Sequence, residues 1–362
     1  MGDNPHSFVT DLTKRPRIFD IMGSALAAVG AAHGPNNLDF PKARQVVFVL
    51  VDGMGYNQLS ARRGHIPFLR GRLGPDALGY TCAPSTTAAA ITSFTTGQEP
   101  SRTKMVGYEV VHAGERLNLI TFAGHEDLPE RWQSQPTWFE RIHDPVAFVG
   151  LPKYAGSGLT RAALRGTTQV CAPDLESSID AAVTLVRGGT KVLYLYWAKL
   201  DHIGHHYGWK SSQWTSELER IDAALADLAR RLPTSTLLVI TADHGMVDTQ
   251  SWKRFDVRAH GLMDGVTALG GEPRALHLHT NDPECGRRWQ QILGERALVE
   301  SNENSLLGQV PDQVAGQFRV WMRENWVGID PLTHSPGARA LVGVHGSLTA
   351  AEIEIPIISE LV

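Results

Sequence analysis

The sequence predicts an α/β protein built on a mostly parallel central sheet that is flanked by helices. Short apolar runs rich in Val, Ile, Leu and Tyr alternate along the chain with segments of helical character. This alternation is typical of a parallel sheet covered by helices. The chain has 362 residues and is 42% hydrophobic, which is enough apolar material for one large core. We therefore expect a single domain over residues 1–362.

The apolar runs that we expect to form buried strands are short and end close to turns. Helical character is clearest at residues 214–232, which are amphipathic, and at the alanine-rich residues 88–94. Further helices are expected around residues 21–32 and 56–63. The expected strands lie in residues 45–51, 79–82, 146–150, 167–172, 192–198, 237–243 and 338–344.

The stretch between His244 and His345 has a different character from the rest of the chain. It contains a strand-like run at residues 274–280, a helical segment at residues 285–293 and a tryptophan-bearing run at residues 318–328. We expect a small cap, inserted at approximately residues 249–336, that shapes access to a functional site.

Potential metal ligands follow the ends of several apolar runs. In open α/β sheets, functional groups collect outside the carboxyl ends of parallel strands, so these side chains should converge. Asp201 and His205 are four residues apart and would share one face of a helical turn. A single aspartate at a strand end is more often a cap or turn residue, so the prediction depends on the whole set. Three carboxylates and three imidazoles suit Zn²⁺ or a similar cation. The set is Asp52, Asp201, His205, Asp243, His244 and His345.

Three hydroxyl residues, Ser85, Thr86 and Thr87, stand directly before the alanine-rich helix. At a helix N-terminus, backbone N–H groups and the helix dipole favour anions such as phosphate. A hydroxyl that binds a metal loses its proton more easily and can attack as an oxyanion. The alternative is that this segment is only a helix cap beside a proline. Next to a two-metal set, a nucleophile is the better interpretation.

The order of these motifs resembles that of the alkaline phosphatase superfamily. More narrowly, it is similar to the type I phosphodiesterase/nucleotide pyrophosphatase family. The resemblance runs from about Gln45 to the C-terminus and implies an alkaline-phosphatase-like core. The motifs that carry it are Asp52-Gly53-Met54, Pro84-Ser85-Thr86-Thr87, Asp201 with Gly204-His205, Asp243-His244-Gly245 and His345-Gly346.

The resemblance implies a role for each of these residues. The nucleophile of the family lies three positions after the proline, which here is Thr87. Thr87 would also contact a metal, attack phosphorus and form a phosphothreonine that is then hydrolysed. Two divalent ions, expected to be Zn²⁺, are implied. One would be held by Asp52, Asp243 and His244, and the other by Asp201, His205 and His345.

The residues expected near the substrate depart from the family pattern. Family members that act on nucleotides often place an aromatic residue directly after the nucleophile, where this chain has Ala88. Tyr108 aligns with an asparagine that binds a phosphoryl oxygen, and a phenol can still donate a hydrogen bond. Tyr154 opens a Tyr-Ala-Gly-Ser stretch similar to one at the substrate pocket of the family. We therefore expect Tyr108 and Tyr154 close to the substrate.

The resulting hypothesis is a two-metal hydrolase of phosphodiester or pyrophosphate bonds. A phosphomonoesterase on the same scaffold stays open because the base-stacking aromatic residue is missing. A catalytically silent metal-binding protein is the third alternative.

Composition narrows the possible partners and the location. The net charge of −4 and pI of about 6.4 do not fit a surface for nucleic acid polymers, so a small-molecule phosphoester is the expected partner. We see no signal peptide and no membrane-spanning segment, and we expect a cytoplasmic location by default. The sequence gives no indication of oligomeric state.

Overall fold

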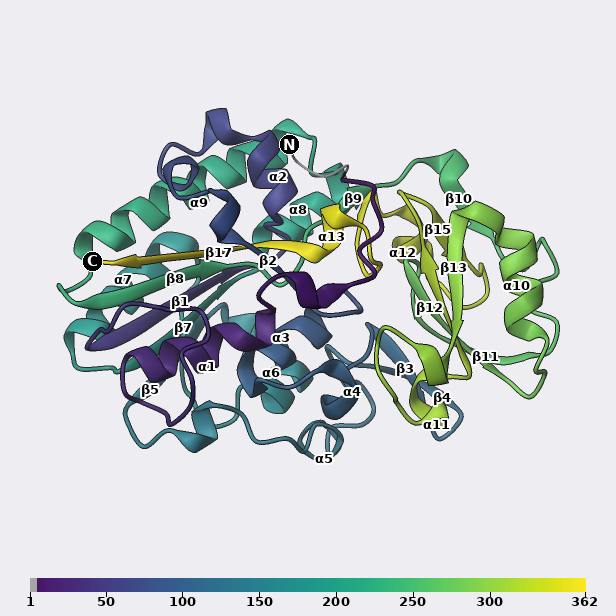
Figure 1. The fold of residues 1–362 in the computed structure, drawn as a ribbon, viewed down its shortest axis with the longest axis horizontal. Helices are drawn as coiled ribbons and strands as arrows, with labels where there is room; N and C mark the ends of the chain where they lie inside the picture. Colours follow the sequence, from purple (N-terminus) through teal and green to yellow (C-terminus); the bar gives the residue numbers. More distant parts are fainter. Residues whose placement is uncertain (1–4) are drawn as a thin grey trace.

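The computed structural model describes residues 5–362, which form a larger and a smaller lobe (Figure 1). The larger lobe contains a seven-stranded sheet with the strand order β2-β17-β8-β1-β7-β5-β6. Strands β8, β1, β7, β5 and β6 run parallel, whereas β17 is antiparallel to both of its neighbours. The predicted mostly parallel sheet is thereby confirmed. Its strands are β1 (Gln45–Val51), β2 (Leu78–Tyr80), β5 (Val146–Gly150), β6 (Thr168–Cys171), β7 (Val192–Trp197), β8 (Thr236–Thr241) and β17 (Glu354–Leu361).

Helices cover the sheet on two sides (Figure 1). On one side, α1 (Ile18–Ala28) packs on α3 (Thr87–Thr96), and α3 packs on α4 (Pro100–Thr103) and α6 (Gly158–Ala163), with α5 (Pro129–Trp132) beside α6. On the other side, α9 (Ser212–Arg231) packs on α7 (Leu175–Arg187) and α8 (Lys199–Tyr207), and α2 (Tyr56–Ala61) lies nearby. The long helix α9 begins where the Ser211 side chain accepts a hydrogen bond from the Trp214 backbone N–H. Its buried residues recur every three or four positions, as an amphipathic helix requires.

Two parts of the strand prediction differ from the structure. Residues 338–344 do not form a strand of the central sheet. They are divided between the short helix α12 (Pro336–Ala340) and the two-residue strand β16 (Gly343–Val344), which pairs with β9 (Val247–Asp248). The helix forms because Pro336 stands at its first turn and the Ser335 side chain accepts from the Ala338 N–H. The second difference is β17, which the sequence interpretation did not include.

The smaller lobe (residues 254–329) is built on an antiparallel sheet with the strand order β11-β12-β14-β13. It has a hydrophobic cluster of its own, in which Trp289 of α10 packs with residues such as Leu276 and Val320. Most of the predicted insertion lies in this lobe, and its role as a cap stays a prediction. Its elements are β10 (Arg254–Asp256), β11 (Val266–Glu272), β12 (Ala275–Thr280), α10 (Cys285–Leu293), β13 (Ala297–Ser301), α11 (Asp312–Ala315), β14 (Phe318–Met322) and β15 (Val327–Ile329).

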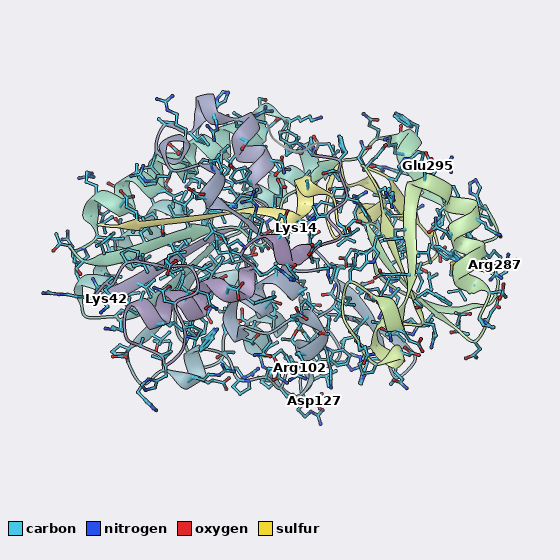
Figure 2. All side chains as sticks on the ribbon, in the orientation of Figure 1. Lys14, Lys42, Arg102, Asp127, Arg287 and Glu295 are labelled. Carbon is cyan, nitrogen blue, oxygen red and sulfur yellow. The ribbon has the colours of Figure 1, made fainter. Side chains whose placement is uncertain are left out.

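Two further elements are the β3–β4 hairpin and the short helix α13. The hairpin of β3 (Glu109–His112) and β4 (Glu115–Asn118) lies against β11, and α13 (Ala350–Ile353) precedes β17. Charged side chains of both lobes, such as Lys42, Arg102 and Arg287, lie on the outside of the molecule (Figure 2). Within residues 5–362, none of the helices combines the length and the apolar character needed to cross a bilayer.

Candidate metal centre and active site

The central strands bring the aspartates of the predicted set to one edge of the sheet. Asp52 directly follows β1, and Asp243 lies two positions beyond the end of β8. Asp201 lies in the first turn of α8, which begins two residues after β7 ends. Because β1 is hydrogen-bonded to both β7 and β8, the carboxyl ends of these three parallel strands are neighbours.

His244 lies between two carboxylates. Its Nε2 is 3.4 Å from Asp52 Oδ1 and 3.4 Å from Asp243 Oδ2. One potential ligand atom from each of these three residues lies within 4.8 Å of the others, and all three side chains are buried. This group could hold one ion.

A second group surrounds Asp201. The four-residue spacing on α8 places His205 Nε2 3.1 Å from Asp201 Oδ2, and His345 Nε2 lies 3.8 Å from Asp201 Oδ1. Ligand atoms of Asp201, His244 and His345 also lie within 4.8 Å of one another. The rings of His244 and His345 stack with their centroids 3.6 Å apart. The two groups are therefore adjacent, and His244 lies at the boundary between them.

The three histidines are oriented by backbone carbonyls. The Nδ1 atom of His205 donates to Gly343 O at 2.8 Å, and that of His244 donates to Gly245 O at 3.0 Å. The Nδ1 atom of His345 donates to Ser85 O at 3.0 Å. A ring that donates through Nδ1 leaves the Nε2 lone pair free for a metal, and such backbone contacts fix the orientation of metal-binding histidines.

The buried carboxylates of this site need a nearby cation if they are to be ionised. Asp52 Oδ1, Asp201 Oδ1 and Asp243 Oδ2 are buried and have no hydrogen-bond partner among the described residues. Burial and the neighbouring carboxylates hold the pKa of Asp52 well above its ordinary value. Burial also raises the pKa of Asp243. Unpaired buried carboxylates are costly unless they are neutralised, and divalent cations bound to oxygen and imidazole would neutralise them. The residues present therefore fit a two-metal centre.

Thr87 is the first residue of α3, and its Oγ1 lies 3.2 Å from His244 Nε2. The helix begins here because Thr86 has an extended backbone and three alanines follow Thr87. The hydroxyl of Thr87 is thus both at a helix N-terminus and beside the first group of ligands. This is the position in which a nucleophile would meet an anionic phosphoryl group.

Ser85 has different surroundings from Thr87. It is fully buried, its Oγ donates to Ser347 O at 2.6 Å, and it accepts from the Gly346 N–H at 3.2 Å. These hydrogen bonds hold the loop that carries His345. Ser85 therefore fixes the loop of a predicted ligand, and its buried hydroxyl is not available to a substrate.

A cavity of about 460 Å³ opens in front of these groups. Tyr108 and Tyr154, which the resemblance places near the substrate, both line it. Tyr108 is 45% exposed, whereas Tyr154 is half-buried with its ring 5.6 Å from that of Tyr196. Thr87, Asp52, Asp201, His205 and His345 contribute to the same walls.

Tyr196 and Glu272 are among the cavity residues that sequence reasoning did not find. Tyr196 donates a hydrogen bond to Asp52 Oδ2, so it orients that predicted ligand. Tyr196 lies near the end of β7, next to β1, the strand that Asp52 follows. This position could have identified Tyr196 from the sequence. Glu272 ends β11 in the smaller lobe and lines the cavity, and its placement depends on tertiary packing alone.

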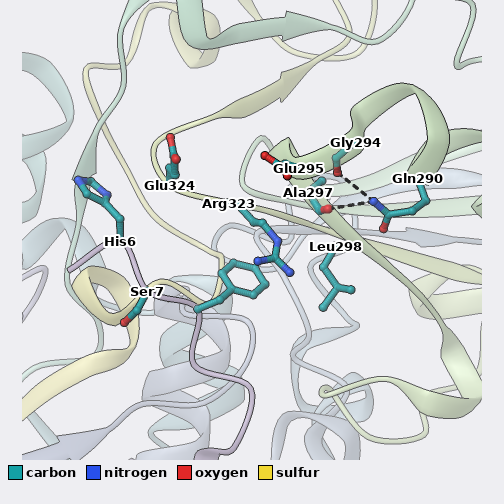
Figure 3. A pocket seen from close by; sticks show the side chains of 10 residues that line it. His6, Ser7, Gln290, Gly294, Glu295, Ala297, Leu298, Arg323 and Glu324 are labelled. Carbon is teal, nitrogen blue, oxygen red and sulfur yellow. Dashed lines mark hydrogen bonds between the residues drawn. The ribbon is translucent and has the colours of Figure 1, made fainter. Parts of the chain in front are cut away.

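Another cavity, of about 660 Å³, lies between the N-terminal segment and the smaller lobe (Figure 3). In it, the amide of Gln290 donates to the carbonyls of Gly294 and Ala297 at 3.0 and 3.2 Å. The guanidinium of Arg323 lies 4.6 Å from the centroid of the Phe8 ring. The residues that line this cavity include none of the predicted ligands, so the candidate chemistry belongs to the first cavity.

The structure is similar to solved structures of the alkaline phosphatase superfamily. Phosphonoacetate hydrolase from Sinorhizobium meliloti 1021, in complex with phosphonoformate, matches with a TM-score of 0.68 and 20% identity, over 88% of this chain and 91% of that one. Murine ectonucleotide pyrophosphatase/phosphodiesterase 5 matches with a TM-score of 0.64 and 14% identity, over 87% and 88% of the two chains. At these identities the likeness establishes the alkaline-phosphatase-like fold.

Sequence comparison finds curated relatives as well. GPI ethanolamine phosphate transferase 3 (catalytic subunit) of Mus musculus is 24% identical over 258 residues, and GPI ethanolamine phosphate transferase 2 of Kluyveromyces lactis is 25% identical over 227 residues. These alignments cover 65% and 58% of this chain but only 23% and 27% of the relatives. The chain thus spans about a quarter of the length of these relatives.

The family model for type I phosphodiesterases/nucleotide pyrophosphatases matches residues 46–264, which is more than half of the chain. This range includes Thr87, the three aspartates, His205 and His244, and the smaller lobe begins shortly before it ends. The chain belongs to the type I phosphodiesterase/nucleotide pyrophosphatase family of the alkaline phosphatase superfamily.

Proposed function

We propose that this protein hydrolyses small-molecule phosphodiesters or pyrophosphates with two divalent ions and Thr87 as nucleophile. The observation that carries the proposal is the position of Thr87 Oγ1, 3.2 Å from His244 Nε2 and at the N-terminus of α3. Family membership supports a phosphoester hydrolase. We further propose that the ions are Zn²⁺ and that the protein is cytoplasmic.

The ligands would be divided between the two ions. Asp52, Asp243 and His244, together with Thr87, would hold one of them, and Asp201, His205 and His345 the other. When bound, the ions supply Lewis acidity, which lowers the pKa of a coordinated hydroxyl and stabilises charge on the phosphoryl oxygens.

The reaction of the chain's own residues has two steps. Thr87 Oγ1 attacks phosphorus and its proton passes to solvent, while the bond from phosphorus to the departing alcohol or phosphate breaks and the departing oxygen takes up a proton from water. Water then attacks the phosphothreonine, releases the phosphoryl product and restores the Thr87 hydroxyl. The N-terminus of α3 faces the negative charge that is present throughout both steps.

A diester is favoured over a monoester by the charges of the cavity. Arg274 is the one lysine or arginine among the described residues that line it, and Arg274 is already paired with Glu352. A monoester carries an additional negative charge that would find no free basic side chain there. The curated relatives are named ethanolamine phosphate transferases, so transfer to an alcohol instead of water is the second candidate.

The test compares turnover of bis(4-nitrophenyl) phosphate, thymidine 5′-(4-nitrophenyl) phosphate and 4-nitrophenyl phosphate by the Zn²⁺-loaded protein. We expect the diesters to be preferred, and Thr87→Ala to lose on the order of a hundredfold or more in kcat while it still binds metal. Thr87→Ser should retain activity. Ser85→Ala should lose ~1–3 kcal/mol of stability because buried hydrogen bonds are removed.

Several outcomes would contradict the proposal. A protein that binds no transition ion after addition of Zn²⁺ would favour a silent protein, and a preference for 4-nitrophenyl phosphate would favour a phosphatase. Products that incorporate an added alcohol faster than water would favour the transferase.

A further inference from the structure

A smaller cavity of about 60 Å³ adjoins the active-site cavity, and we call it the side pocket. The two cavities share the lining residues Thr87, Ile120, Tyr154 and Tyr196. The proposed nucleophile therefore lies at the boundary between them. The mechanism described above uses the cavity that holds the metal ligands and gives no role to the side pocket.

Apolar side chains from several elements line the side pocket. Ile91 lies on α3 one turn after Thr87, Phe148 comes from β5, and Leu164 directly follows α6. All three of these apolar side chains are buried. None of the described residues that line the pocket is charged. A hydrocarbon group gains free energy by leaving water for such surroundings, whereas an ammonium or carboxylate group would find no counter-charge there.

The hydroxyl groups around the side pocket already have partners within the protein. Ser157 Oγ donates to Thr160 Oγ1 at 3.1 Å, and Thr160 Oγ1 donates to Tyr154 O at 2.8 Å. The Tyr196 hydroxyl donates to a carboxylate of the first ligand group. These hydroxyl protons are not free to recognise a polar group of a substrate, so the pocket favours an apolar one.

The volume of the side pocket limits the size of that group. An apolar cavity of ~150 Å³ lined by Leu, Ile and Phe holds one benzene molecule. By the same ratio, about 60 Å³ takes roughly two or three carbon atoms. An ethyl or propyl group fits this space, whereas a sugar ring or a nucleobase is larger.

The position of Thr87 indicates which group of the substrate the pocket takes. In phosphoryl transfer the attacking and leaving oxygens are roughly in line, so the leaving group departs from the side of phosphorus opposite Thr87. Because Thr87 itself lines the side pocket, the pocket is placed for the ester group that stays on phosphorus. We propose that the protein acts on phosphodiesters whose retained alcohol is a short, uncharged alkyl group, and that the side pocket binds this group. This inference rests on the proposed function and adds the substrate class.

The test compares 4-nitrophenyl phosphodiesters whose second alcohol is methyl, propyl, hexyl or 2-aminoethyl. For the Zn²⁺-loaded protein we expect kcat/KM to rise about fourfold for each methylene added between the methyl and propyl esters. The hexyl ester should bring no further gain because the pocket is full. The 2-aminoethyl ester is nearly as large as the propyl ester, and its charge should lower kcat/KM about tenfold relative to the propyl ester.

Variants of the pocket should change the dependence on chain length, with the methyl ester as the internal reference. Ile91→Ala enlarges the pocket, so the hexyl ester should become the best substrate. Leu164→Phe fills it, so the ratio of propyl to methyl should fall close to one. Ile179 is similarly buried but lies in α7 on the other side of the sheet and lines neither cavity, so Ile179→Ala should keep the wild-type ratios. Metal content and the thermal midpoint are measured for each variant.

The outcomes distinguish this inference from the proposed function. Equal kcat/KM for the methyl and propyl esters overturns alkyl recognition and leaves the hydrolase standing, as does a rise that continues unchanged to the hexyl ester. A preference for the 2-aminoethyl ester also overturns it. Identical ratios in Ile91→Ala and Ile179→Ala would assign the preference to another part of the cavity and overturn the side pocket as its cause. If the wild-type protein hydrolyses none of the esters, the proposed function fails and the inference fails with it.

Discussion

His202, His205 and His206 lie on the same short helix, yet the structure gives them different surroundings. His205 Nδ1 is held by Gly343 O, and its Nε2 points to Asp201. His202 is exposed, and its Nδ1 donates to Ala198 O at 2.8 Å within its own helix. His206 is exposed, with its ring beside that of Tyr207. The surroundings of each histidine ring, and not its position in the sequence, decide whether that ring can coordinate a metal ion.

Loss of Asp201 or His205 should lower the metal content of the protein. Asp201→Ala and His205→Ala should each lose one of two bound ions and nearly all turnover, because each removes a side chain with a ligand atom in the second group. His202→Ala and His206→Ala should keep both ions. Metal per protein is measured by mass spectrometry after dialysis against metal-free buffer. Equal losses from all four substitutions would show that the ligand assignment is wrong.

Strand β12 carries two buried histidines outside the active site. His277 has no hydrogen-bond partner for either ring nitrogen, and His279 has none for Nε2, within the described residues. Burial and the nearby guanidinium of Arg319 lower the pKa of His279 to about 4 and the pKa of His277 well below its ordinary value. The folded protein therefore keeps these rings neutral, whereas an unfolded chain protonates them below about pH 6.5.

The consequence is a loss of stability in acid. As pH falls from about 6.5 towards 4, the unfolded state binds protons that the folded state does not, so the free energy of unfolding decreases. Each ring contributes at most about 1.4 kcal/mol per pH unit. We predict that His279→Gln makes this decrease shallower, as measured by urea unfolding between pH 7.5 and 4.5. Parallel curves for variant and wild type would refute this.

Much of the larger lobe could be predicted because buried parallel strands are continuous apolar runs. Strands β1, β7 and β8 are of this kind, and the aspartate that follows each of them was identified from the sequence. Strand β17 was missed because Pro356 and the polar residues Ser359 and Glu360 interrupt its apolar pattern. Glu272 could not be identified, since only the packing of the two lobes brings that hairpin turn to the cavity.

A buried ion pair joins the smaller lobe to the larger one. The side chains of Arg274, after β11, and Glu352, in α13, are both fully buried, with Nη2 and Oε2 2.6 Å apart. Glu352 also accepts from the Ser347 N–H at 3.0 Å and from the Thr349 hydroxyl at 2.5 Å. The pair thus connects the lobe that carries Glu272 with the loop that carries His345.

Breaking this pair should be strongly destabilising. Arg274→Met leaves the Glu352 carboxylate buried without its cation, and we predict a loss of ~3–5 kcal/mol in the free energy of unfolding. Adding Glu352→Gln to Arg274→Met should recover part of this loss, because the unpaired charge is gone. Urea unfolding of the two single variants and the double variant measures the coupling. Strictly additive effects would mean that the pair does not link the lobes energetically.

The position of β17 has a consequence for the order in which the protein can be assembled during synthesis. This strand lies between β2 and β8 in the sheet. Strand β2 can therefore join the sheet only after β17, which follows the smaller lobe in the sequence, has been synthesised. Until then, β8 presents an unpaired edge next to the aspartate and histidine that follow it, and such edges invite pairing with other chains. Until residues 354–361 pair with β8, a growing chain exposes a strand edge that can bind other chains, so this segment is expected to govern how soluble the protein is during folding.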